Sequence, residues 1–176
     1  MAQRPTAQGS SLRVRVETAG SGRASVETGL PVLDDLLELL ARSARFDLEL
    51  ESHAGGGEAE VDAVGFALGE ALAQALARPG ARGVAGATAP ADEALAHVTL
   101  EASGRPLVVA NVDLTSARIG GLRSDLLHRL LEALAEGAGL TVHVRLLHGE
   151  DTRHVLVAIV KALGLALAEA CSTRPA

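Results

Sequence analysis

Alternation of apolar and polar residues predicts strands in both halves of the chain. The clearest case is segment 140–147, where apolar residues occupy every second position and polar ones lie between them. This is the pattern of a strand with one buried face. Five other segments are predicted as strands. The six expected strands are 12–17, 23–28, 46–52, 97–102, 106–114 and 140–147.

Apolar residues at helical spacing predict four helices. In the segment 151–170 they form a broad stripe made of Val155, Ala158, Ile159, Ala162, Leu163, Ala166 and Leu167. Asp151 or Thr152 is expected to cap this helix. The other helices are expected at 31–43, 58–77 and 124–136. Stripes so rich in alanine predict close packing between helices.

The two halves of the chain repeat each other. FALGEALAQA (66–75) reappears as KALGLALAEA (161–170), and LDDLLELLARSARFDLEL (33–50) corresponds to LHRLLEALAEGAGLTVHV (127–144). We therefore expect one domain, residues 1–176, built from a β-β-α-β-α unit used twice. The expected repeats are 12–77 and 96–170, joined by a Gly/Ala/Pro-rich loop at 78–95. The predicted fold class is α+β, with two four-stranded-type sheets and paired helices.

Composition narrows the class of protein. Of the 176 residues 48% are hydrophobic, enough for a sizeable core, while the net charge of −6 and the 1% of aromatic residues disfavour nucleic-acid partners. The longest apolar stretch, 155–170, is short for a membrane span and contains Lys161. The segment MAQRPTAQGSS has no apolar signal core, so we expect a cytoplasmic protein with no membrane partner. The one cysteine, Cys171, is expected to be a buried structural thiol.

Two groups of residues could carry chemistry. Glu58 and Asp62 lie one helical turn apart at the start of a helix, where carboxylates are either ordinary stabilisers of the helix dipole or ligands. His143, on the polar face of its strand, is expected to approach His154 at the adjoining helix start. Two neighbouring imidazoles are the beginning of a metal site, but only a beginning.

The order of motifs resembles that of the imidazoleglycerol-phosphate dehydratases, the lyases of histidine biosynthesis. The resemblance covers nearly the whole chain, and the family fold is a duplicated α+β unit, in agreement with the internal repeat. The motifs that carry it are TGLPVLDDLL (28–37), VGFALG (64–69), PADEALA (90–96), SGRP (103–106) and AGLTVHVRLLHGE continuing into RHVLVAIVKALGLAL (138–167).

The resemblance implies a site for two manganese ions, but most of the family's ligands are replaced here. The His of the family's L-D-H motif is Asp35, and the family's N-terminal Glu is Gln8. Only His143 and His154 keep the family's ligand type. The two H-H-x-x-E motifs read Glu58, Ala59, Asp62 and Arg153, His154, Val157.

The phosphate-binding positions are partly kept. By resemblance, Arg105 of SGRP and Lys161 of the family's F-K-A motif would hold the substrate phosphate. A third family arginine is Val84 here, with Arg82 two residues before it as a weak substitute.

These replacements predict a divergent, catalytically inactive homologue: a pseudoenzyme acting as a structural or regulatory subunit. We expect a homo-oligomer, which by resemblance would be a trimer, or assembly with an intact paralogue. We expect no cofactor. One alternative is an altered lyase acting on a phosphorylated imidazole or a related small molecule. It would bind Mn²⁺ or Mg²⁺ weakly through His143, His154, Asp35, Glu58 and Asp62. Another alternative is a module that binds a small phosphorylated ligand through Arg105 and Lys161 without catalysis.

Overall fold

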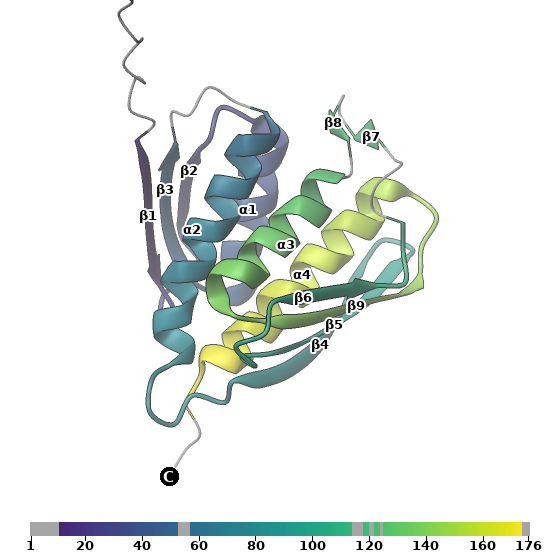
Figure 1. Cartoon of the computed structure of the whole chain (residues 1–176). Coiled ribbons are helices and arrows are strands. Elements are labelled where there is room, and N and C mark those ends of the chain that lie inside the picture. The colour runs from purple at the N-terminus through teal and green to yellow at the C-terminus, as the bar shows by residue number, and fades with distance from the viewer. Residues whose placement is uncertain (1–10, 53–56, 114–117, 120–121, 124, 174–176) are drawn as a thin grey trace, which may run out of the picture.

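A computed structural model describes residues 11–52, 57–113, 118–119, 122–123 and 125–173. Four helices lie between two sheets (Figure 1). The first sheet has the strand order β1-β3-β2 and the second β4-β5-β9-β6. The helices are α1 (Pro31–Ala44), α2 (Glu58–Leu76), α3 (Asp125–Ala138) and α4 (Thr152–Cys171). The strands are β1 (Leu12–Glu17), β2 (Ala24–Glu27), β3 (Asp47–Ser52), β4 (Val84–Ala91), β5 (Ala94–Glu101), β6 (Leu107–Ala110), the short ribbon β7 (Arg118–Ile119) and β8 (Leu122–Arg123), and β9 (Thr141–His148).

The two sheets share one topology. β3 pairs antiparallel with β1 and parallel with β2, and β9 pairs antiparallel with β5 and parallel with β6. The α+β class with a repeated β-β-α-β-α order is therefore confirmed. The expected strand number is wrong for the first sheet, which has three strands in the part of the chain that the structure describes.

The segment 78–95, predicted as a loop, contains a strand. β4 pairs antiparallel with β5 along its whole length, from Val84 opposite Glu101 to Ala91 opposite Ala94. Its sequence, VAGATAPA, is full of residues that usually interrupt strands. An edge strand accommodates Pro90 because one side of its backbone makes no ladder bonds. The small buried side chains of β4 also let α4 pack closely on this edge.

The strand expected at 106–114 is also shorter in the structure, where β6 spans Leu107–Ala110. β6 ends at Ala110, although the Asn111 amide still donates to the Val144 carbonyl of β9 at 3.3 Å. Beyond this bond the Asn111 side chain takes the place of a strand partner. Asn111 Oδ1 accepts the Leu146 amide at 2.7 Å, and its Nδ2 donates to the Leu146 carbonyl at 3.2 Å. The last predicted residue, Leu114, lies outside the described residues.

The helices pack across the repeats at glycines. A Cβ built on Gly69 of α2 would lie 2.5 Å from the Leu134 carbonyl of α3. On Gly164 of α4 it would lie 2.9 Å from the Leu40 carbonyl of α1. Only glycine allows backbones this close, so the predicted close packing is confirmed.

α4 is long and apolar enough to cross a membrane by length and composition, yet 67% of its most apolar window is buried inside the fold. It packs against α1, β4 and β5. The N-terminus of this helix is capped as predicted, with Asp151 Oδ1 accepting the amides of Arg153 and His154 at 2.9 and 3.1 Å. Cys171, at its other end, is 6% exposed, as expected for a structural thiol.

Candidate functional site

Asp35 and Arg153 line one groove between α1 and α4. The groove has a volume of about 630 Å³. Among the described residues, neither the Asp35 carboxylate nor the Arg153 guanidinium forms an ion pair. Apart from these two residues and Arg42, the walls are aliphatic, formed by Val32, Leu36, Leu39, Leu156 and Val157.

Glu58 and Asp62 hold an arginine from the neighbouring helix. Arg129 of α3 donates from Nε to Asp62 Oδ1 and from Nη1 to Glu58 Oε2, both at 3.1 Å. A further bond runs from Arg129 Nη2 to Asp62 Oδ2, so the guanidinium grips this carboxylate with two nitrogens. The hydrogen bonds with Asp62 are the main cause of a raised pKa for Arg129. The positively charged Arg129 is therefore bound to Glu58 and Asp62, two of the three carboxylates that the sequence suggests as replacement ligands.

His154 is bound by the turn that joins β4 and β5. Its Nδ1 lies 2.5 Å from Glu93 Oε2, and its Nε2 lies 3.4 Å from Asp92 Oδ2. The hydrogen bond to Glu93 is the main cause of the raised pKa of His154. The pKa of Glu93 is lowered to about 2, first by the Asp151 amide and then by His154. This environment favours an imidazolium with both nitrogens protonated, which has no lone pair to offer a metal.

His143 lies elsewhere on the second sheet. It is half-buried on β9, in register with Thr99 of β5. Glu93, in the β4–β5 turn that holds His154, precedes Thr99 by six residue steps, or about 20 Å along the strand. The expected approach of His143 to His154 is therefore not seen.

The donor set does not fit the family's pair of manganese ions. No three His, Cys, Asp or Glu side chains gather as a metal site anywhere in the described ranges. Arg153 brings a positive charge and Val157 has no donor atom, while Arg129 neutralises the carboxylates of the other motif. The family's Glu position, Gln8, lies outside the described residues.

The two residues expected to bind phosphate lie at opposite ends of the second sheet. Lys161 Nζ donates to the Pro90 carbonyl at 2.6 Å, next to Leu95 at the start of β5. Arg105 follows the other end of β5, where Thr141 Oγ1 donates to its carbonyl at 3.0 Å. The six residue steps from Leu95 to Glu101 correspond to about 20 Å. One chain therefore does not bring Arg105 and Lys161 together.

Arg82, the substitute for the third family arginine, is engaged elsewhere. Its Nη1 donates to Glu169 Oε1 of α4 at 3.0 Å. It fastens the segment before β4 to the end of α4.

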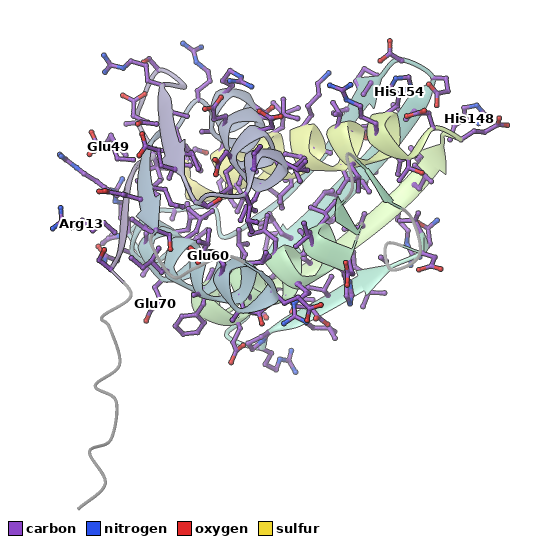
Figure 2. All side chains as sticks on the ribbon, turned by 90° about the horizontal axis from the view of Figure 1, so that it is seen from above. Arg13, Glu49, Glu60, Glu70, His148 and His154 are labelled. Atoms are coloured by element: carbon purple, nitrogen blue, oxygen red, sulfur yellow. The ribbon has the colours of Figure 1, made fainter. Side chains whose placement is uncertain are left out.

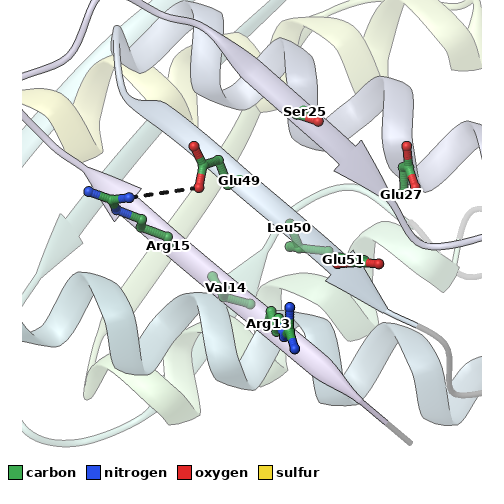
Figure 3. A pocket seen from close by; sticks show the side chains of 8 residues that line it. All are labelled: Arg13, Val14, Arg15, Ser25, Glu27, Glu49, Leu50 and Glu51. Carbon is green, nitrogen blue, oxygen red and sulfur yellow. Dashed lines mark ion pairs between the residues drawn. The ribbon is translucent and has the colours of Figure 1, made fainter.

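The outer face of the first sheet forms a second, more open hollow (Figure 3). Its volume is about 500 Å³, and rows of opposite charge line it: Arg13 and Arg15 on β1, Glu49 and Glu51 on β3. Arg15 Nη1 and Glu49 Oε2 are 4.0 Å apart with both side chains more than 70% exposed, so this is a weak surface pairing. The face is remote from His154, which lies on the opposite side of the molecule (Figure 2).

Comparison with known proteins identifies the family. The sequence profile described as imidazoleglycerol-phosphate dehydratase matches residues 28–167. The chain belongs to the imidazoleglycerol-phosphate dehydratase family. It is 40% identical over 158 residues to the dehydratase of Syntrophobacter fumaroxidans, covering 86% of this chain and 79% of that one. It is 37% identical over 174 residues to the dehydratase of Azorhizobium caulinodans, covering 94% and 86%.

Solved structures of dehydratases have the same fold. The enzyme from Staphylococcus aureus superposes with a TM-score of 0.85 at 25% identity, with 98% of each chain covered. The enzyme from Pyrococcus furiosus, in a complex with (S)-C348, superposes with a TM-score of 0.82 at 27% identity, covering 98% of this chain and 94% of that one. The dehydratase fold is thus intact in this chain.

The sequence pattern does not indicate two of the partners in this site. Glu93 lies inside the motif PADEALA, which carries the family resemblance. Arg129 corresponds to Asp35 in the internal repeat, which could have drawn attention to it. Its contact with Asp62, 67 residues away, depends on how α2 and α3 cross.

Proposed function

We propose that this chain is a non-catalytic member of the dehydratase family, acting as a structural or regulatory subunit in histidine biosynthesis in the cytoplasm. The observation that carries the proposal is the grip of Arg129 on Glu58 and Asp62. At the first ligand motif, an internal cation takes the place that a metal would need.

The second ligand motif supports the same conclusion. Arg153 and Val157 supply no ligand, and the Nδ1 of His154 is engaged by Glu93 at 2.5 Å. A catalytic metal centre usually has three or more protein ligands. Of the family's ligand positions, His143 alone keeps an imidazole without a carboxylate partner among the described residues, so dehydration through a metal pair has no support in these residues.

We expect the chain to form a trimer or another small homo-oligomer, or to assemble with an intact paralogue. The separation of about 20 Å between the ends of β5 supports an oligomer, because Arg105 and Lys161 could share a ligand only across two chains. Native mass spectrometry with and without Mn²⁺ tests this. A trimer unaffected by metal is expected; a larger shell that forms only with Mn²⁺ would contradict it.

Calorimetric titration with Mn²⁺ tests the loss of the metal pair. The dehydratase of Clostridium botulinum, 35% identical over 166 residues, is a suitable positive control. We expect no saturable heat from this chain under conditions where the control binds. Tight binding of two ions per chain would overturn the proposal, and weak binding of one Mn²⁺ or Mg²⁺ would favour the altered lyase instead.

A phosphate-binding module is the alternative with a specific observation in its favour. The Arg105 side chain is exposed and makes no ion pair with any described residue, while Ser103 and Thr141 fix its backbone. Titration with inorganic phosphate separates the two functions. Binding that is lost in R105Q but kept in R145Q would favour the module, and the absence of binding would exclude it.

A further inference from the structure

The two interhelical grooves of the fold are related by the internal repeat. Residue 35 of α1 corresponds to residue 129 of α3, and residue 58 of α2 corresponds to residue 153 of α4. The groove between α2 and α3 has Arg129 facing Glu58. In the groove between α1 and α4 the charges are exchanged, with Asp35 on the short helix and Arg153 on the long one.

The charges are neutralised in one groove only. Arg129 is bound by two carboxylates, whereas Asp35 and Arg153 form no ion pair with each other or with another described residue. Arg42, the other cation on this groove, is already bound to Glu38 at 3.1 Å. The groove between α1 and α4 therefore presents one available cation and one available anion.

The rest of the groove lining is mainly aliphatic. Leu36 and Leu156 form the floor and are 8% and 4% exposed. Leu39 and Val157 are half-exposed on the walls. Concave apolar surface with a few convergent charges is the usual composition of a small-molecule site.

We propose that this groove binds a small aliphatic zwitterion, of which an aliphatic α-amino acid is the simplest form. Arg153 takes the carboxylate, because a guanidinium binds a carboxylate with two parallel hydrogen bonds. Asp35 takes the ammonium group, and the aliphatic chain covers Leu39 and Val157. The inference goes beyond the proposed function, which requires no ligand in this groove.

Titration of the ¹⁵N-labelled protein with L-leucine, followed by NMR, tests the proposal. We expect saturable shifts of the amides around residues 35–39 and 153–157. The compounds 4-methylpentanoate and 3-methylbutylamine each lack one of the two charges, and each should bind more weakly than leucine. The absence of saturable shifts, or shifts confined to other surfaces, would overturn the proposal.

Two variants assign the charges. R153Q should lower the affinity for leucine about tenfold or more, because it removes a charge-assisted pair. R145Q, at another exposed arginine that forms no ion pair with a described residue, is the matched control and should bind as the unchanged protein does. D35N should weaken leucine binding and leave 4-methylpentanoate unaffected. Equal affinities of R153Q and R145Q would contradict the proposal without bearing on whether the chain is a dehydratase.

Discussion

Gly69 and Gly164 occupy equivalent positions in the two long helices, and each is crossed by a short helix of the other repeat. α3 crosses α2 at Gly69, and α1 crosses α4 at Gly164. The equivalence follows from the repeat itself, since FALGEALAQA and KALGLALAEA place the two glycines in register. Each half of the molecule therefore completes the core of the other.

The substitution G69A should destabilise the protein. The added Cβ would lie 2.5 Å from the Leu134 carbonyl and 2.8 Å from the Ala138 nitrogen, so α2 and α3 must move apart. Overpacking of this kind costs about 1–3 kcal/mol, against a gain of up to about 1 kcal/mol from the better helix propensity of alanine. We expect a net loss of about 1–2 kcal/mol in the free energy of unfolding, measured with urea. G164A should cost less, and E70A, at an exposed neighbouring position, should have little effect. A G69A protein as stable as E70A would contradict the close crossing.

The substitution R129Q should lower the thermal stability of the protein. Without the guanidinium, Glu58 and Asp62 repel each other one turn apart at the start of α2. The loss should be larger at low than at high salt, because salt screens exposed charges. Thermal unfolding followed by circular dichroism, with R145Q as the control, measures it. An identical loss at all salt concentrations would indicate that Arg129 acts through packing rather than charge.

Asp47 should make the stability sensitive to acid. Its carboxylate accepts the amides of Ser21 and Arg23 and pairs with the Arg23 side chain, and these contacts lower the pKa of Asp47 well below its usual value. A group with a lowered pKa in the folded state stabilises the protein above its unfolded pKa, near 4, and this contribution is lost as the pH falls below that value. D47N should therefore be less stable at pH 7, and the difference should shrink toward pH 2. A difference that stays constant with pH would show that the carboxylate charge is not involved.

Cys171 should react slowly with a thiol reagent while the protein is folded. Burial raises its pKa to about 11, so very little thiolate is present at pH 8. Reaction with Ellman's reagent should be slow in buffer and fast in guanidinium chloride. Equally fast reaction in both would show that the end of α4 opens readily.

The regular elements of this fold were predictable because each has a strong local signal. α1 and α4 follow stripes of leucine and valine, and β9 alternates strictly. β4 could not be predicted, because its side chains are too small to show an alternation of apolar and polar residues. It forms because it pairs with β5 along its whole length and packs against α4.

The site was less predictable, because its contacts join distant parts of the sequence. The pairs Arg129–Asp62 and His154–Glu93 join residues 67 and 61 positions apart, on elements whose relative position the sequence pattern does not specify. The resemblance indicates which of the family's ligand types this sequence lacks. It does not indicate that Arg129 binds the carboxylates of Glu58 and Asp62. Nor does it indicate that Glu93 binds the imidazole of His154.

The central claim is that this chain keeps the dehydratase fold without dehydratase chemistry. The most direct test is turnover of imidazoleglycerol phosphate by the purified protein in excess Mn²⁺, measured beside the Clostridium botulinum enzyme under the same conditions. We expect no turnover above the rate without protein. A rate near that of the control enzyme would contradict the account.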